Sequence, residues 1–220
     1  MSKLMLKKLD LLCELFLEWN SKINLSSFKT AEMVMQKHIE DSLVLNEHIQ
    51  LESKKVLDVG TGGGFPMLPL ALSNPTANFV GIDSVQKKLT AVADMLAKLE
   101  LTNVELIHER AETLAHTPDY REQFDVVVSR AFAKWPVNLE LCLPFVKIGG
   151  VFVAYGGPSI LAELEKYKNL EAQYGADLDT VITLELPDSD KYLVVVRKIA
   201  KCSKNYPRSY KKVRVAFDLI

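Results

Sequence analysis

The sequence predicts an α/β fold in which parallel strands alternate with helices and the last two strands form an antiparallel hairpin. From residue 55 onward, short apolar segments alternate with amphipathic ones, the pattern of a parallel sheet with helices on both faces. Only five residues separate the apolar segments 180–186 and 192–199, and a connection that short requires antiparallel strands. At 220 residues, 48% hydrophobic and 25% charged, the chain fits one sizeable globular domain.

The first 52 residues predict a helical segment in front of the sheet. Apolar residues recur at three- and four-residue steps over 3–19, so an amphipathic helix is expected there, ending near Asn20-Ser21, with irregular chain over 19–25. Thr30 is a plausible N-cap for a helix that runs from Ala31 toward Gln36. A further helix is expected over 37–48. This segment is expected to pack on the core as a sheet cover or a lid beside the ligand cleft.

The remaining elements alternate along the chain. The expected strands are 55–60, 77–83, 104–110, 124–131, 149–154, 180–186 and 192–199. The expected helices run from Pro66 to about Leu72, from Val85 to Leu99, over 137–143, and from Ser159 to about Leu170. Ser159 is expected to cap the last of these, and the polar link through Pro118 is expected to include a short helix. We therefore predict a helical segment 1–52, a core domain 53–199 and a basic tail 200–220, together one compact unit.

Four glycines in five positions follow the first strand and define the main candidate site. The stretch from Lys55 to Phe65 reads KVLDVGTGGGF, and such a turn lets backbone approach a nucleotide-like ligand without Cβ atoms in the way. The spacing is G-x-G-x-G, at Gly60, Gly62 and Gly64, and not the G-x-G-x-x-G of dinucleotide sites. The alternative is a tight turn with no ligand, which four glycines would weaken.

The ends of the later strands supply further candidates. Asp83 ends the second strand, where an acidic side chain can accept the hydroxyls of a ribose. Ligands bind at the carboxyl ends of parallel strands, so Ala111, Glu112 and Arg130 are expected around the same crevice. Ala111 and Glu112 are candidates for holding adenine, although a solvated loop acid is the favoured alternative for Glu112. For Arg130, ligand contact and a structural ion pair are equally open.

One fold class combines three of these features, namely the G-x-G-x-G spacing, an acid at the position of Asp83 and a final antiparallel hairpin. That class is the Rossmann-like fold of class I S-adenosylmethionine-dependent methyltransferases, here preceded by the N-terminal helical segment. The predicted cofactor is therefore S-adenosylmethionine. The cofactor contacts that we predict from the turn itself are Gly62, Gly64 and Asp83.

Charge is distributed unevenly, although the net charge is only −1. Eight basic residues and no acid lie between Arg197 and Arg214, while the remaining 19 basic and 28 acidic residues leave the rest of the chain at −9. This asymmetry indicates an anionic partner, and Tyr206 and Tyr210 among the cations suit stacking on RNA. A tail kept basic for solubility is the alternative. The predicted RNA-binding residues are Lys201, Lys204, Arg208, Lys211, Lys212 and Arg214.

Several other classes of protein are disfavoured. The three cysteines are far apart and show no C-x-x-C spacing, which favours reduced thiols, a cytoplasmic setting and no zinc site. Acidic residues interrupt the apolar N-terminal run, unlike a signal peptide, and no run is long enough to span a membrane. His38 and His48 fall on different helix faces, so no metal is expected. A hydrolase elbow, G-x-S-x-G, is absent from the sequence.

Six motifs occur in the order seen in the glucose-inhibited division protein B family, and they span nearly the whole chain. They are WNSKINLSS (19–27), HIEDS (38–42), DVGTGGGFPMLPLA (58–71), IDS (82–84), SRAFA (129–133) and YPR (206–208). The chain resembles this family of bacterial small-subunit ribosomal RNA guanine-N7 methyltransferases. The resemblance implies cofactor contacts at Gly60, Phe65, Ala111, Glu112 and Arg130. It also implies that small-subunit rRNA or the 30S subunit is the partner.

Two positions depart from the family pattern. Family members usually carry Lys-Gly after the fifth strand, where this chain reads Tyr155-Gly156, so Lys134 or Lys147 would have to supply the missing charge. The tail also lacks the Gly-x-Pro step that often follows YPR.

The implied chemistry needs no general base, because guanine N7 has a free lone pair, and Arg130 is the best candidate for shaping the site. His38 or Asp41 is a candidate for placing the base if the helical segment folds over the cleft.

One alternative function is that of a methyltransferase acting on protein or a small molecule, from which steep salt dependence would distinguish RNA binding. The other is a non-catalytic RNA-binding or assembly factor, which calorimetry with the cofactor would distinguish. A monomer is expected.

Overall fold

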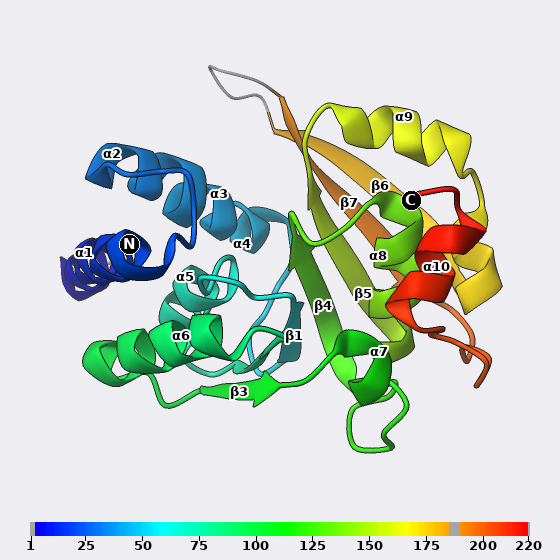
Figure 1. The fold of residues 1–220 in the computed structure, drawn as a ribbon, viewed down its shortest axis with the longest axis horizontal. Helices are drawn as coiled ribbons and strands as arrows, with labels where there is room; N and C mark the ends of the chain where they lie inside the picture. Colours follow the sequence, from blue (N-terminus) through cyan, green and yellow to red (C-terminus); the bar gives the residue numbers. More distant parts are fainter. Residues whose placement is uncertain (1–2, 185–189, 220) are drawn as a thin grey trace. The chain divides into compact units, whose positions relative to one another are not determined.

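The computed structural model describes residues 3–184 and 190–219 and divides into two compact units, Met1–His108 and Glu109–Ile220, which are taken in turn (Figure 1). In the first unit, three parallel strands lie in the order β3-β2-β1. They are β1 (Lys55–Val59), β2 (Asn78–Asp83) and β3 (Val104–His108). The crossovers are α5 (Met67–Ser73) and α6 (Gln86–Leu99). The predicted βαβ alternation is confirmed here.

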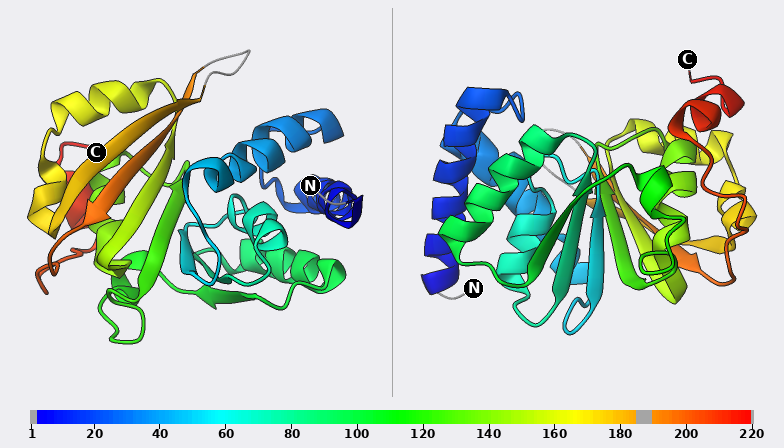
Figure 2. Two further views of the ribbon diagram at one scale, coloured as in Figure 1. Left: turned by 180° about the vertical axis from the view of Figure 1, so that it is seen from behind. Right: turned by 60° about the horizontal axis from the view of Figure 1, so that its bottom comes forward.

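The N-terminal helices pack onto these crossovers. Helix α1 (Lys3–Ile23) lies against α6 and α5, and Figure 2 shows α1 and α6 side by side. The helix runs to Ile23, past its predicted end near Asn20-Ser21. The helix continues because the buried Asn20 side chain accepts a hydrogen bond from Ser26 N (2.8 Å) and donates one to Phe28 O (2.7 Å). Asn20 thus holds the following loop against the helix instead of ending it.

A second helical stretch runs from residue 31 to 48, interrupted only by a single turn residue, Val44. It comprises α2 (Ala31–Val34), a π-helix (Met35–Glu40), α3 (Asp41–Leu43) and α4 (Leu45–His48). The predicted N-cap is confirmed, since Thr30 Oγ1 accepts from Met33 N at 3.3 Å. The predicted division into two helices is wrong, because a π-helical turn carries the chain past residue 36.

The second unit contains a mixed sheet in the order β4-β5-β7-β6. Strands β4 (Phe124–Arg130) and β5 (Val146–Gly156) are parallel, whereas β7 (Lys191–Lys198) runs antiparallel to β5 and to β6 (Ala176–Leu184). The predicted antiparallel hairpin is confirmed, and its connecting residues 185–189 lie outside the described part of the chain. Val126, Val127 and Val128 are all buried, as expected for a strand covered on both faces.

Short helices flank this sheet, and some bounds differ from the prediction. They are α7 (Ala111–Leu114), α8 (Trp135–Cys142) with a 3-10 turn (Leu143–Phe145), α9 (Ser159–Lys166), a 3-10 turn (Leu170–Tyr174) and α10 (Tyr210–Ala216). Ser159 is the first residue of α9 and makes no capping hydrogen bond, so the predicted cap is wrong. The expected helix as far as Leu170 ends at Lys166, and Asn169 then has a φ of 60°.

The basic tail is folded against this unit. Arg121 donates hydrogen bonds to four carbonyl oxygens, three of them in the tail, at Cys202, Ser203 and Tyr206 (2.9–3.0 Å). Pro207 O is 2.9 Å from His116 Nε2. Helix α10 packs on α8. Among the described residues, no helix has both the length and the apolar character needed to cross a membrane.

Candidate functional site

The glycine turn of the first unit is fixed by backbone hydrogen bonds to β2. Gly60 N and Thr61 N both donate to Ile82 O at 2.9 Å, and Gly64 N donates to Thr61 O at 2.8 Å. The turn therefore keeps its shape without help from a ligand. A rigid turn of this kind presents preorganised backbone to whatever binds there.

The glycines of this turn serve different purposes. A Cβ on Gly64, whose φ is +91°, would lie 2.5 Å from Leu68 Cδ1, and a Cβ on Gly63 would lie 2.8 Å from Phe16 Cε2. Packing explains both glycines without a ligand, and the positive φ of Gly64 is a further reason for glycine there. At Gly62, with φ +57°, a Cβ would meet only one oxygen at 3.8 Å. The space beside Gly62 is open, as a ligand cradle requires, so the turn fits a nucleoside cofactor.

Asp83 has a role that its position alone did not reveal. Its Oδ2 accepts from Gly62 N at 3.0 Å, its Oδ1 accepts from Val85 N at 2.8 Å, and the residue is only 8% exposed. The carboxylate thus holds the middle of the glycine turn. Each carboxylate oxygen has a second acceptor position, so the same group can also accept ribose hydroxyls. Thr61, on the same turn, is buried, and its Oγ1 has no hydrogen-bond partner among the described residues.

Aromatic residues from the N-terminal helices pack on the end of the turn. The ring of His38 stacks on that of Phe65, with centroids 4.7 Å apart and an interplanar angle of 15°. Phe16 meets both rings edge-on, at 5.3 Å and 5.0 Å. His38 Nε2 is 2.9 Å from Ser26 Oγ. The WNSKINLSS and HIEDS motifs therefore contribute to the environment of Phe65, a predicted cofactor contact.

In the second unit, Ala111 and Glu112 open α7 rather than forming a loop. Ala111 is buried, and Glu112 Oε1 accepts from Tyr210 N (3.3 Å) and lies 3.9 Å from Arg110 Nη1. The alternative of a solvated loop acid is wrong, because this carboxylate holds the first residue of α10. Arg130 ends β4, is half-buried, and stands opposite Tyr155 in the β4–β5 register.

The predicted site residues thus fall into two groups, one in each unit. The first unit brings Gly62 and Asp83 into direct contact, and Gly60, Gly64 and Phe65 belong to the same turn. The second unit holds Ala111, Glu112 and Arg130 at the chain positions that follow β3 and end β4. Their roles as cofactor contacts stay predictions.

The predicted RNA-binding residues of the tail differ in exposure. Lys201, Lys204, Lys211, Lys212 and Arg214 are exposed. Arg208 instead donates through Nε and Nη2 to Glu140 (2.9 and 2.6 Å), which is fully buried, and its backbone N donates to the same carboxylate at 2.7 Å. This ion pair raises the pKa of Arg208. The structure gives Arg208 an anchoring function, while an RNA contact for it stays a prediction.

Glu140 is the principal residue that sequence reasoning missed. It also accepts a hydrogen bond from Tyr174 Oη at 3.1 Å. Burial, together with the neighbouring Glu140, raises the pKa of Tyr174. An acid between Leu139 and Leu141, in a helix whose only other polar side chain is that of Asn138, was the available signal, since a buried carboxylate needs a partner.

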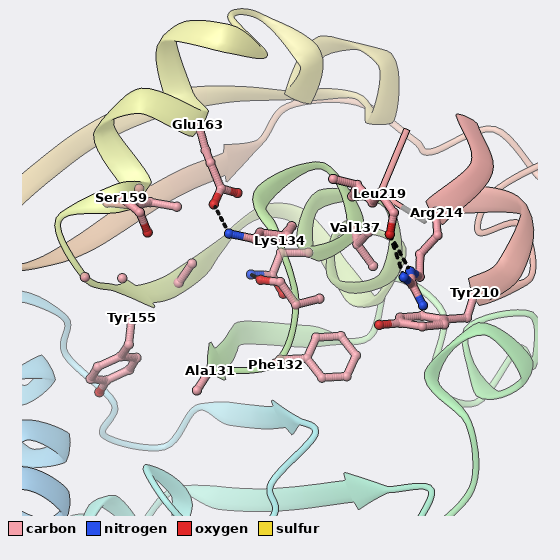
Figure 3. A pocket seen from close by; sticks show the side chains of 16 residues that line it. Ala131, Phe132, Lys134, Val137, Tyr155, Ser159, Glu163, Tyr210, Arg214 and Leu219 are labelled. Atoms are coloured by element: carbon pink, nitrogen blue, oxygen red, sulfur yellow. Dashed lines mark hydrogen bonds and ion pairs between the residues drawn. The ribbon is translucent and has the colours of Figure 1, made fainter. Parts of the chain in front are cut away.

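A pocket of about 560 Å³ opens at the carboxyl ends of β4 and β5 in the second unit (Figure 3). Its walls are the segment 131–134, the end of β5 with Gly156 and Gly157, the start of α9, and α10. The volume lies within the range of about 300–1,000 Å³ typical of small-molecule sites. The basic tail is therefore part of a pocket wall, through Tyr210 and Arg214.

Comparison with solved structures supports the fold class. The chain is similar to a mutant of the 16S rRNA (adenine(1408)-N(1))-methyltransferase with cosubstrate SAM from Catenulisporales acidiphilia (TM-score 0.57, 18% identity, 70% of this chain and 88% of that chain). It is also similar to the Methanococcus jannaschii fibrillarin pre-rRNA processing protein (TM-score 0.57, 18% identity, 70% of each chain). The predicted fold, that of class I S-adenosylmethionine-dependent methyltransferases, is confirmed.

Sequence relatives cover far more of the chain. Ribosomal RNA small subunit methyltransferase G of Clostridium novyi is 40% identical over 198 residues, covering 89% of this chain and 82% of that protein. The Bacillus subtilis protein of the same name is 36% identical over 206 residues, covering 92% and 86%. The family model of GidB, rRNA small subunit methyltransferase G, matches residues 5–190. The chain therefore belongs to the GidB family, as its motifs predicted.

Proposed function

We propose that the protein transfers a methyl group from S-adenosylmethionine to N7 of a guanosine in small-subunit ribosomal RNA. The observation that carries the proposal is the glycine turn whose Gly62 N donates to Asp83, in a chain that matches the GidB family model over residues 5–190. It acts on the RNA or the 30S subunit, in the cytoplasm and as a monomer. The exposed cations of the tail support an RNA partner.

Each unit supplies its own proposed cofactor contacts. In the first, Asp83 and the backbone beside Gly62 hold the ribose, and Phe65 is kept in place by its stack on His38. In the second, Ala111 and Glu112 are the contacts for adenine, and Arg130, at the end of β4, shapes the site. When bound, S-adenosylmethionine supplies a methyl group on a positively charged sulfur.

No side chain has to remove a proton in this reaction. Guanine N7 carries an in-plane lone pair and no proton at neutral pH, so it attacks the methyl carbon directly. The task of the protein is then alignment, an effect that can supply up to ~7–11 kcal/mol. Asp83 is accordingly a binding residue and not a general base.

The test uses deproteinised small-subunit rRNA and intact 30S subunits with labelled S-adenosylmethionine, followed by mapping of the modified atom. We expect 7-methylguanosine at one position. Label on another atom, or on protein only, would refute the proposal. Asp83→Asn should abolish labelling by weakening cofactor binding, whereas Asp179→Asn, at an exposed acid paired with Arg197, should leave it intact.

A further inference from the structure

The pocket at the carboxyl ends of β4 and β5 is assigned no occupant by any feature described so far. We infer that it receives the purine nucleotide that is methylated, an inference that rests on the proposed function. It also indicates which of the two candidate lysines, Lys134 or Lys147, meets the phosphate of the RNA.

The lining of the pocket combines rings, backbone and cations in the way that single-stranded RNA sites do. Phe132, Tyr155 and Tyr210 contribute aromatic rings, as Figure 3 shows. Stacking on such rings is worth ~1–3 kcal/mol per base. A Cβ on Gly157 would meet no atom within 4 Å, so a ligand can approach the backbone there.

Cations stand at two places on the wall. Lys134 is exposed and lies 3.2 Å from Glu163 Oε1, and Arg214 donates through Nε to Leu219 O at 3.0 Å. The carboxylate of Glu163 is engaged, because its other oxygen accepts from Trp135 N at 2.6 Å. The lining thus presents an excess of positive charge, which suits a phosphate-bearing ligand.

The other candidate for the missing charge is in the wrong place. Lys147 lies at the start of β5 and pairs with Asp125 at the start of β4. Because β4 and β5 are parallel, this pair is at the opposite end of the strands from the pocket. Lys134, and not Lys147, therefore takes the phosphate.

An unsatisfied acceptor in the lining favours guanine over adenine. Asn138 is 7% exposed and its Nδ2 donates to Ala133 O (3.0 Å), which fixes the orientation of the amide. Its buried Oδ1 accepts no hydrogen bond from the described residues. Guanine presents its donors, N1–H and the N2 amino group, on the edge away from N7, whereas the donor of adenine, the N6 amino group, lies beside N7. Recognition through these donors leaves N7 free to react.

The first experiment fills the pocket. Gly157→Phe adds a ring where the backbone is open, and Lys134→Gln removes the cation. We expect at least a tenfold loss of kcat/KM for rRNA in Gly157→Phe and a several-fold rise of KM in Lys134→Gln. The Kd for S-adenosylmethionine should be unchanged, which also shows that the variants are folded. Lys147→Gln, the matched lysine with a carboxylate partner, should behave as wild type.

Unchanged methylation by Gly157→Phe would overturn the inference and leave the proposed function standing.

The second experiment does not depend on turnover. Small-subunit rRNA containing 6-thioguanosine is irradiated with the wild-type protein and S-adenosylhomocysteine, and the crosslinked peptides are identified. Crosslinks within 131–138, 155–160 or 210–214 support the pocket as the acceptor site. Crosslinks confined to other peptides overturn it, even if the RNA proves to be methylated.

Discussion

Breaking the ion pair between Arg208 and Glu140 is expected to destabilise the second unit more than breaking any comparable surface pair. In Arg208→Ala, the buried Glu140 keeps the hydrogen bonds from the backbone N of residue 208 and from Tyr174 Oη but loses both guanidinium donors. Removing one partner of a buried pair costs ~3–5 kcal/mol. The side chain of Arg208 is 33% exposed, so we expect a value near the lower end, about 3 kcal/mol.

A second arginine provides the matched control. Arg197 pairs with Asp179 at 2.5 Å, but their side chains are 48% and 37% exposed. Exposed pairs contribute ~0.2–1 kcal/mol, so Arg197→Ala should cost under about 1 kcal/mol. Urea unfolding, followed by circular dichroism at pH 7, measures both.

The two variants should also differ in thermal stability. At roughly 2–4 °C per kcal/mol for a chain of this size, the Tm of Arg208→Ala should fall by about 6–12 °C. Glu140→Gln in the Arg208→Ala background should recover part of the loss, because the unpaired buried charge is gone. Equal costs for Arg208→Ala and Arg197→Ala would show that the pair is not the anchor of the tail.

Three further predictions concern the first unit and the alkaline stability of the second. Gly62→Ala should weaken S-adenosylmethionine binding at least tenfold, as measured by calorimetry, and should lower the free energy of unfolding by ~1–2 kcal/mol. Gly64→Ala should lower the free energy of unfolding further, because its Cβ overlaps Leu68. Equal losses of stability in the two variants would contradict the different roles of these glycines. His38→Ala should weaken cofactor binding about 2- to 13-fold, because an aromatic pair contributes ~0.5–1.5 kcal/mol. His48 is exposed, so His48→Ala should leave the affinity unchanged. Identical affinities of the two variants would refute a role for the stack of His38 on Phe65. The raised pKa of Tyr174 keeps its hydroxyl protonated in the folded state, whereas a tyrosine of the unfolded chain ionises near pH ~10. The free energy of unfolding of the wild type should therefore fall above that pH, and it should fall less in Tyr174→Phe. Urea titrations at alkaline pH measure the difference.

The order of strands and helices could be predicted from the sequence because the periodicity of apolar residues is a local property of each segment. Apolar runs such as 126–128 and the five-residue hairpin connection determine strand type without long-range information. Helix ends were less predictable, since Asn20 extends α1 through contacts with residues that follow it. The π-helical turn at 35–40 has no comparable sequence signal.

For the candidate site, the sequence located the turn but not the reasons for its residues. Gly63 and Gly64 are explained by contacts with Phe16 and Leu68, one of which is distant in sequence. The carboxylates of Asp83 and Glu112 hold backbone N–H groups, which only three-dimensional proximity reveals. Pairing of Arg208 with Glu140 could not be predicted for the same reason.

The attachment of the final twenty residues bears on how the protein tolerates shortening. A stop codon just after β7 would remove three of the four carbonyl acceptors of Arg121, the Cys202 N–H donor to Glu122 and the Arg208 donors to Glu140, although each of the three side chains would keep one other partner. Termination at that point should therefore destabilise the second unit.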